Sequence, residues 1–456
     1  MARILVTSLP FAGHVGPTGA LAAELVHRGH HVVAYTGRKY RDRFVAAGAQ
    51  WLPWTRAQDF DDADLGATFP GLGDGKGLRG ARANGDLILF GTASGQARDI
   101  LAAAEREPFD LVVADQLGFG AGLAAEALAI PWASVAVTPL TMVSSRDLPP
   151  PGTPFPPGTG RLSRVRDALL RAAAGLAYRR LVDPRLNRIR AEVGLGRAAL
   201  GAPDSLYSPR LLLAQGVPAL EYPRTDLPGQ VHFVGRLTPA RRPDPAHQPP
   251  ASRPDPPMPS PASRPDPAHR RPAWWSDLVA ARTSGRPVVH ITQGTLDVDL
   301  ADLVRPAVAA LAGAEALVVC TTGGVPPDTL GPLPENVRAA AFLPHDLLLP
   351  LVDVMVTNGG WGGVLAAVEH GVPLVVAGGS LDKPEVARRV ARAGVGLDLR
   401  TGEPGRRRIR RAVATVLDGP EFRRRARALA AELAAAGGIP AAADLVEGLL
   451  TPRTGG

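Results

Sequence analysis

Short apolar runs alternate along the chain with segments of helical periodicity, and this alternation predicts parallel β-sheets. The first apolar run, Arg3–Thr7, is followed by a glycine-containing loop and by a predicted helix from about Pro17 to Arg28. Proline suits the first turn of a helix, and Gly29 suits the left-handed position that ends one. A second apolar and β-branched run, His31–Thr36, follows at once. Strand–helix–strand spacing of this kind is the unit of a parallel sheet with right-handed crossovers.

The second half of the chain repeats this plan. It begins with an apolar run at Pro287–Thr292, a predicted helix at Asp299–Leu311 and a further run at Ala316–Thr321. Such near-continuous apolar strands are typical of parallel sheets that helices cover on both faces. We therefore predict two doubly wound α/β domains in tandem, with their ligands at the carboxyl ends of the strands. The other predicted strands are Leu111–Ala114, Trp132–Val137, Asp353–Thr357 and Pro373–Ala377, and the other predicted helices are Gly118–Leu128, Gly362–Glu369 and Lys383–Ala393.

A proline-rich tract, Thr238–Pro272, lies between the two halves and differs from both. It contains Arg-Pro-Asp-Pro three times at intervals of eleven residues, and it holds almost nothing to bury. Proline at this density removes backbone donors and favours extended conformations, so we interpret the tract as a linker. A docking segment for a proline-reading partner is the alternative interpretation. We predict an N-terminal domain at 1–232, the linker at 233–272 and a C-terminal domain at 273–456.

At 456 residues, 45% hydrophobic and 21% charged, the chain has the size and composition of two globular domains. No apolar run approaches the roughly 20 residues of a membrane span, and the N-terminus has no signal-peptide pattern. The single cysteine, Cys320, excludes an internal disulfide and lies in an apolar run, where we expect a buried thiol. We therefore expect a cytoplasmic protein without a membrane span.

The net charge of +8 would suit a nucleic-acid partner, but the distribution of the charge does not. Almost all basic residues are arginines, because the only lysines are Lys39, Lys76 and Lys383, and arginine with alanine and proline is what GC-rich codons encode. The basic residues are scattered apart from two arginine clusters in the C-terminal region. No helix-turn-helix, zinc-finger or RNA-platform pattern accompanies them, so we expect no nucleic-acid partner.

A histidine stands where the first strand gives way to the first helix, in Phe11-Ala-Gly-His14-Val-Gly-Pro17. Imidazole is the side chain best suited to accept a proton near neutral pH, although a loop histidine can also simply bond to the backbone. Asp115 follows the strand Leu111–Ala114, so its carboxylate should reach the same edge of the sheet. A carboxylate beside a histidine fixes its tautomer and stabilises the imidazolium. His14 and Asp115 are our candidate catalytic residues, and capping of the next helix is the alternative role of Asp115.

Glycine-rich turns follow two strands of the second half. Asn358-Gly-Gly-Trp-Gly-Gly363 lies between a strand and a helix, and Thr292-Gln-Gly-Thr295 follows that half's first strand. Glycines let the backbone approach a phosphate, and a helix N-terminus offers free N–H groups and a partial positive charge. The spacing differs from the dinucleotide fingerprint G-x-G-x-x-G. Two such turns at matching strand ends indicate a phosphate-binding pocket.

The chain carries several longer motifs besides these. The N-terminal ones are Gly13–Pro17 and Arg28–Val32, and the C-terminal signature comprises Phe342–His345, Val356–Gly363, Gly371–Pro373 and Asp382–Val390. With them the chain resembles the two-domain GT-B glycosyltransferases of the UDP-glycosyltransferase superfamily, above all the bacterial enzymes that glycosylate macrolides and other natural products. The resemblance covers nearly the whole chain apart from the proline-rich tract.

The resemblance implies two Rossmann-like domains that face a cleft, with the acceptor on the N-terminal domain and a sugar nucleotide, UDP- or dTDP-linked, on the C-terminal domain. The sugar would pass directly to a hydroxyl of a small, largely hydrophobic acceptor, with inversion at the anomeric carbon. His14 matches the catalytic base and Asp115 the acid that supports it. No cofactor beyond the co-substrate is implied. We expect a monomer or weak homodimer.

The resemblance also assigns the binding residues. Phe342 matches the aromatic against the nucleobase, the glycine turns match the diphosphate-binding elements, and Asp382 and Lys383 match the pair that holds the sugar hydroxyls. Variable N-terminal loops, here Ala67–Asn84 and Met142–Phe155, would form the acceptor pocket. The implied donor-binding residues are Gly294, Thr295, Phe342, Leu343, Asn358, Gly359, Gly360, Gly362, Gly363, Asp382 and Lys383, and the implied acceptor-binding residues are Phe11 and Met142.

Two positions depart from the pattern of the family. Most members have histidine where this chain has Asn358, whose amide can donate a hydrogen bond but carries no charge. Lys383 stands where glutamine is usual, and it adds a cation near the donor. A catalytically silent nucleotide-sugar-binding partner protein is therefore an alternative, although the presence of both His14 and Asp115 argues against it. A third hypothesis is an epimerase that acts on the nucleotide sugar itself, and the match at Phe11–Pro17 argues against this hypothesis.

A pair of aspartates, Asp297 and Asp299, has the spacing of the metal-binding pair of another class of sugar transferases. Here the pair comes just before a predicted helix, where acidic residues cap the N-terminus and offset the dipole. No histidine or aspartate cluster elsewhere in the sequence completes a metal site. We predict that the protein binds no metal.

Overall fold

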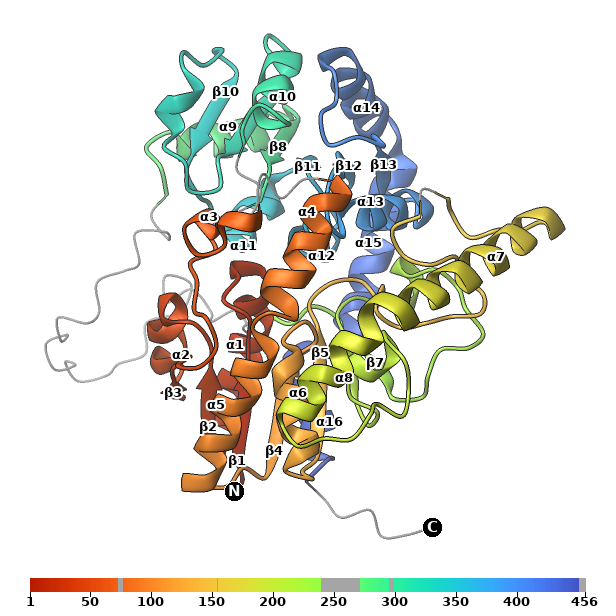
Figure 1. The fold of residues 1–456 in the computed structure, drawn as a ribbon. Helices are drawn as coiled ribbons and strands as arrows, with labels where there is room; N and C mark the ends of the chain where they lie inside the picture. The colour runs from red at the N-terminus through yellow and green to blue at the C-terminus, as the bar shows by residue number, and fades with distance from the viewer. Residues whose placement is uncertain (73–76, 154, 239–270, 295–298, 451–456) are drawn as a thin grey trace, which may run out of the picture.

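Two parallel β-sheets, one above the other in Figure 1, organise the structure. This computed structural model describes residues 1–72, 77–153, 155–238, 271–294 and 299–450. The first sheet has seven strands in the order β3-β2-β1-β4-β5-β6-β7, and the second has six in the order β10-β9-β8-β11-β12-β13. Neighbouring strands within both sheets are parallel. The prediction of two doubly wound α/β units is confirmed.

Eight of the thirteen strands in the described residues lie close to where the apolar runs predicted them, whereas β3, β6, β7, β10 and β13 were not predicted. The strands β4, β8, β9 and β11 are buried along their whole length. In the first sheet they are β1 (Arg3–Thr7), β2 (His31–Tyr35), β3 (Gln50–Leu52), β4 (Leu111–Asp115), β5 (Trp132–Ala136), β6 (Leu212–Ala214) and β7 (Val231–Phe233). In the second they are β8 (Val288–Thr292), β9 (Leu317–Thr321), β10 (Val337–Ala340), β11 (Val354–Thr357), β12 (Leu374–Val376) and β13 (Gly396–Asp398).

Helices connect the strands and cover both faces of each sheet. In the first half they are α1 (Ala12–His27), α2 (Arg41–Ala46), α3 (Leu65–Thr68), α4 (Gly77–Asn84), α5 (Ala93–Arg106), α6 (Phe119–Ala127), α7 (Arg161–Ala177) and α8 (Asp183–Glu192). In the second they are α9 (Trp275–Ser284), α10 (Val304–Leu311), α11 (His345–Leu348), α12 (Trp361–Glu369), α13 (Lys383–Arg392), α14 (Arg406–Asp418), α15 (Pro420–Ala435) and α16 (Gly438–Glu447).

Helix α1 begins earlier than its sequence predicted. It starts at Ala12 rather than near Pro17, which lies inside the helix. The start is fixed by Asp62, whose carboxylate accepts a hydrogen bond of 2.9 Å from the backbone N–H of Ala12. Because a helix N-terminus has unsatisfied N–H groups, this remote carboxylate stabilises one more turn than the local sequence would. As a result His14 lies in the first turn of a helix rather than in a loop.

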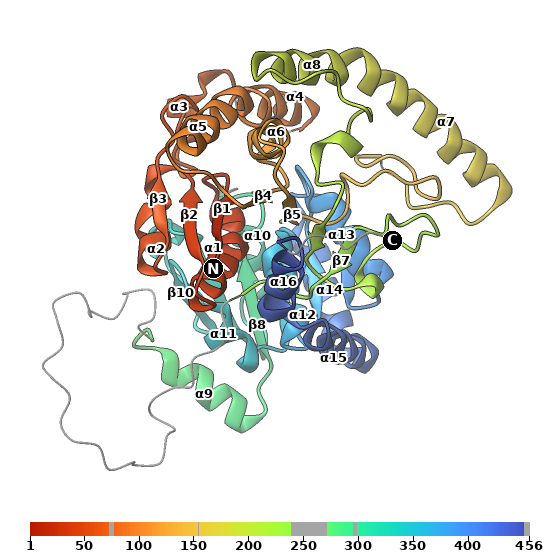
Figure 2. The ribbon, with the colours of Figure 1, turned by 90° about the horizontal axis from the view of Figure 1, so that it is seen from below.

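The last helix, α16, returns to the first sheet. Ile439, Ala442 and Val446 are buried in the same apolar cluster as Ile4 of β1 and Leu21 of α1. Figure 2 shows α16 next to α1. Residues 438–447 of the range predicted for the C-terminal domain therefore pack with the N-terminal half, which ties the two halves together.

Ion pairs and hydrogen bonds of charged side chains also join α16 to the end of α1. The guanidinium of Arg28, at the end of α1, donates to Asp444 at 2.6 Å and to Glu447 at 2.9 Å. The imidazole of His30 lies 2.8 Å from the Glu447 carboxylate.

The predicted domain bounds stay a prediction. The predicted linker also stays a prediction, because residues 239–270 lie outside the described residues.

The segment Pro420–Glu447 is long enough and apolar enough to cross a membrane by length and composition alone. In the structure it consists of two helices, α15 and α16, separated by Gly437 with φ of 84°. Leu429 and Leu433 of α15 are buried in the core of the second half, and α16 is buried on the first. Both apolar faces thus already have partners within the protein.

His290, in the middle of β8, is fully buried. Its Nδ1 lies 3.0 Å from the backbone carbonyl of Val319, and its Nε2 has no hydrogen-bond partner. Burial lowers the pKa of His290 from 6.5 to about 4, because the charged imidazole is deprived of water, although the bond to Val319 acts in the opposite direction. The unfolded chain therefore binds this proton at a higher pH than the folded chain does.

Between these two pKa values the unfolded state holds more protons, so the free energy of unfolding must fall as the pH falls, by about 1.4 kcal/mol per pH unit for this group. We predict that His290→Gln flattens this dependence between pH 6.5 and pH 5 in denaturant titrations. His27→Gln is the matched control, because the His27 side chain is 84% exposed. An unchanged pH slope in His290→Gln would contradict the assignment.

Candidate active site

His14 and Asp115 meet at the carboxyl edge of the first sheet. The Nδ1 of His14 lies 2.7 Å from the Oδ2 of Asp115. Asp115 is the last residue of β4, which pairs with β1, and α1 follows β1 after a short loop, so the topology brings the two side chains together. The Asp115 side chain is 0% exposed and that of His14 is 15% exposed. The predicted proximity of the two residues is thus present in the structure.

Two backbone groups hold the Asp115 carboxylate in place. Its Oδ2 accepts a hydrogen bond of 2.9 Å from Leu9, and its Oδ1 accepts one of 3.0 Å from Leu117. Helix α6 begins at Phe119 with Gly118 as its cap residue, so the Asp115 side chain does not cap that helix. With the carboxylate as acceptor, Nδ1 of His14 carries the proton and Nε2 is left as the basic nitrogen. Such a pair can accept a proton from a substrate.

Phe11 and Met142, the predicted acceptor-binding residues, lie in the apolar cluster next to this pair. Phe11 is the residue before α1, and its ring centroid lies 5.3 Å from the His14 imidazole and 5.1 Å from Phe60. Met142, in the loop after β5, is partly buried against the same cluster. Phe60, which the sequence reasoning missed, carries no local signal that would place it here.

On the second sheet, the loops after β8 and β11 are joined by Asn358. Its Nδ2 donates a hydrogen bond to the backbone carbonyl of Gln293. Gly294 and Gly359, which follow these two residues, have φ of 75° and 92°, a region that favours glycine. A Cβ on Gly359 would also meet Val376 at 2.8 Å. Asn358 is therefore a link between two strand ends as well as a candidate ligand residue.

The remaining glycines of the turn form the N-terminus of α12. Gly360 is the cap residue, and Gly362 and Gly363 lie in the first turn. A Cβ on Gly360 or Gly362 would meet no atom within 4 Å, so the space over this turn is open. A nine-residue helix offers free N–H groups and a partial positive charge there, which suits a phosphate.

A cavity of about 400 Å³ lies against the second sheet beside these loops. It is lined by Asn358 and Lys383 among the predicted residues, together with Gln293, Ser380 and Glu403. Its polar lining suits a sugar or a phosphate group. Gln293 was missed by the sequence reasoning: its amide donates to the Asp299 carbonyl at 2.5 Å and accepts from the N–H of Val304 at 3.4 Å.

These bonds explain why the predicted helix at Asp299–Leu311 starts later. The helix α10 begins at Val304, and the backbone N–H of Val304 donates its hydrogen bond to the side chain of Gln293 rather than to Asp299. The Asp299 carboxylate instead accepts a hydrogen bond of 3.0 Å from the backbone N–H of Ala301. The prediction that Asp299 caps the helix is wrong. Thr295 and Asp297 lie outside the described residues.

Phe342 and Leu343, two further predicted donor residues, differ in exposure. The Phe342 side chain is half exposed and available to stack on a base, whereas Leu343 is buried in the core of the second half. The Leu343 side chain therefore belongs to the core rather than to an open binding surface.

Asp382 is the cap residue of α13, directly before Lys383. Burial raises its pKa above the usual range, while the charges of Lys383 and His14 act in the opposite direction. His14 of the first half is thus among the charged groups that act on this carboxylate of the second half.

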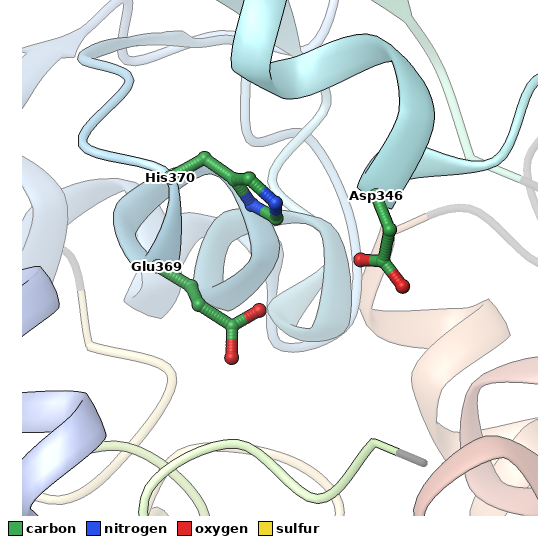
Figure 3. Close-up of side chains that lie close together, drawn as sticks. All are labelled: Asp346, Glu369 and His370. Atoms are coloured by element: carbon green, nitrogen blue, oxygen red, sulfur yellow. The ribbon is translucent and has the colours of Figure 1, made fainter. Parts of the chain in front are cut away.

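Within the described residues, one group of side chains has the spacing of a metal site: Asp346, Glu369 and His370 (Figure 3). Both carboxylates already have a cationic partner, because the Arg236 guanidinium donates to Asp346 at 3.4 Å and also to Glu369. Glu369 is the last residue of α12, about 13 Å along that helix from its glycine turn. This group therefore lies away from the candidate active site.

Comparison with known proteins adds independent information. Residues 306–450 match the family described as erythromycin biosynthesis protein CIII-like, C-terminal domain. The chain is 42% identical to the 4'-demethylrebeccamycin synthase of Lentzea aerocolonigenes over 98% of this chain and 100% of that protein. It is 30% identical to UDP-glucosyltransferase 1 of Beauveria bassiana over 94% of this chain and 91% of the other.

Among solved structures, the glycosyltransferase of kitacinnamycin superposes with a TM-score of 0.71 at 24% identity, and the match covers 99% of both chains. This likeness shows that the two sheets are arranged as in that enzyme's fold. The match extends over both halves, including the elements that carry His14, Asp115 and Asp382.

Proposed function

Because the chain belongs to the GT-B glycosyltransferases of natural-product type, we propose that it transfers its sugar by a single inverting displacement, without a metal ion and with His14 as the base. The chain is a nucleotide-sugar glycosyltransferase that acts on natural-product acceptors. The observation that carries the proposal is the bond of 2.7 Å between His14 and the buried Asp115.

The acceptor hydroxyl gives its proton to Nε2 of His14 while its oxygen forms a bond to the anomeric carbon. The bond from that carbon to the diphosphate oxygen breaks on the opposite side, so the configuration inverts. Asp115, held by two backbone N–H groups, stabilises the imidazolium that forms. The proton leaves His14 after the product has departed.

The negative charge of the departing diphosphate needs compensation that a metal ion supplies in other enzymes. Here the first turn of α12 offers free N–H groups, and Lys383, which is buried and lines the polar cavity, offers a cation. Asn358 carries no charge, and its amide already bonds to Gln293. We therefore assign the cationic role to Lys383. The donor is a UDP- or dTDP-sugar, and the acceptor is a small, largely hydrophobic molecule.

We predict that His14→Ala lowers turnover about 10²–10⁴-fold, or about 3–5 kcal/mol in the barrier, because a hydroxyl is a poor nucleophile until its proton is removed. Donor binding, measured by thermal shift with UDP and dTDP, should be unchanged, because the donor residues lie on the other half. His27→Ala, at the exposed end of the same helix, is the control. Retention of most of the turnover by His14→Ala with an aliphatic alcohol as acceptor would refute the base assignment.

We also expect EDTA to leave the transfer rate unchanged, since helix N–H groups and Lys383 compensate the diphosphate. The measurement is the initial rate after dialysis against EDTA, with and without added magnesium or manganese. A rate that is lost on dialysis and restored by either ion would overturn the metal-free mechanism. Lys383→Gln should lower the rate under the same conditions without making it dependent on metal.

A further inference from the structure

Helix α7 presents a row of apolar side chains to solvent. The row consists of Leu162, Val165, Leu169 and Leu176, which are 89%, 58%, 68% and 43% exposed. Their spacings of three, four and seven residues place them on one face of the helix, which we call the outer face of α7. Figures 1 and 2 show α7 at the outer edge of the protein. Single exposed leucines are common, but an aligned row of them is typical of an interaction surface.

The opposite side of α7 is fixed to the protein. Asp167 is buried and accepts a hydrogen bond of 2.8 Å from the backbone N–H of Gly158 and one of 2.8 Å from the guanidinium of Arg166. Arg171 donates a hydrogen bond of 3.1 Å to the backbone carbonyl of Leu148, in the loop after β5. Because these contacts set the rotation of the helix about its axis, the leucines of the outer face stay in solvent.

Positive charge lies at both ends of the outer face. The segment Arg161–Val182, which is α7 and the helical turn that continues it, holds six arginines and one acidic residue, the buried Asp167. Four of the arginines are exposed and form no ion pair with any residue that the structure describes: Arg161, Arg164, Arg179 and Arg180. The outer face is thus an apolar strip between guanidinium groups that have no counter-ion in the described chain.

These charges decide between two occupants of the outer face. Leucines seven residues apart also suit a coiled-coil seam with a second copy of the chain. In such a seam Arg161 and Arg166 take the flanking positions, so a second copy would bring like charges together, and the one acidic residue of α7, Asp167, is buried. An anionic surface is complementary to both parts of the face. Basic amphipathic helices of this kind are typical of segments that lie in the headgroup layer of a membrane.

We propose that the outer face of α7 docks the protein on a membrane that contains anionic phospholipids. Leu162, Leu169 and Leu176 enter the boundary between headgroups and acyl chains, about 5–10 Å deep, and the exposed arginines bind lipid phosphates. The binding is peripheral and reversible, because one helix face buries far less apolar surface than a spanning helix does. The inference goes beyond the proposed function and does not depend on it, since it concerns a surface and not the reaction.

The first test separates the outer face from exposed apolar side chains elsewhere. The double variant Leu162→Gln, Leu169→Gln removes two leucines from the face, and glutamine is a good helix former. The double variant Val279→Gln, Leu333→Gln is the matched control, because these residues are 48% and 37% exposed but belong to the second half. The probe is vesicles of phosphatidylcholine and phosphatidylglycerol in equal parts, and the measurement is cosedimentation. We expect the outer-face variant to bind about 10–100-fold more weakly than wild type, and the control to bind as wild type does.

The second test concerns the charge. The double variant Arg161→Gln, Arg164→Gln should bind the same vesicles about 10–30-fold more weakly, because each arginine near an anionic surface strengthens binding about fivefold. The control Arg407→Gln, Arg424→Gln removes equal charge from exposed positions of α14 and α15 and should bind as wild type does. Added salt should weaken the binding of wild type, since salt screens exposed charges. Vesicles of phosphatidylcholine alone should bind wild type far more weakly than the mixed vesicles.

Three results would overturn the docking surface. The first is the absence of wild-type binding to the mixed vesicles, and the second is an equal loss of binding in the outer-face variants and their controls. The third is a concentration-dependent dimer in analytical ultracentrifugation without vesicles that Leu162→Gln, Leu169→Gln abolishes, because the face would then belong to a second copy. Failure of wild type to transfer sugar from UDP- or dTDP-sugars would instead overturn the proposed function, since vesicle binding does not depend on turnover.

Discussion

One hydrogen bond, between His14 and Asp115, is the constraint on which the rest of the active-site arrangement depends. It exists because β1 and β4 are neighbours in the first sheet, so the residues that follow β1 and end β4 meet at one edge. Asp62 contributes from a distance, since its bond to the N–H of Ala12 starts α1 early enough to place His14 in the first turn. The Leu9 and Leu117 N–H groups then orient the carboxylate toward the imidazole.

The second half supplies the candidate binding site for the sugar nucleotide. Asn358 ties the loops after β8 and β11 together, and the open first turn of α12 lies beside them. The start of α13 belongs to the same site, because Lys383 lines the polar cavity together with Asn358. The return of α16 to the first sheet and the buried Glu221–Arg389 pair fix the two halves relative to each other.

The elements whose signal is local could be predicted from the sequence. The apolar run at 3–7 became β1 and the run at His31 became β2, and the motif around His14 and the glycine turn lie at the strand ends where the candidate site is. What could not be predicted depends on residues far apart in the chain. Asp62 moves the start of α1 by contact with Ala12, Gln293 moves the start of α10, and Glu221 meets Arg389 across 168 residues. No periodicity or propensity encodes such contacts, because they form only when the sheets have assembled.

The central claim is that His14 and Asp115 act as one unit, with Asp115 working only through the imidazole. A double-mutant cycle of single-turnover rates with His14→Ala, Asp115→Asn and the combined variant tests it most directly. The account predicts that the combined variant is as slow as His14→Ala alone, within about twofold, because residues that act as a unit are not additive. If the losses of the two single variants instead multiply in the combined variant, Asp115 has a separate role and the account is contradicted.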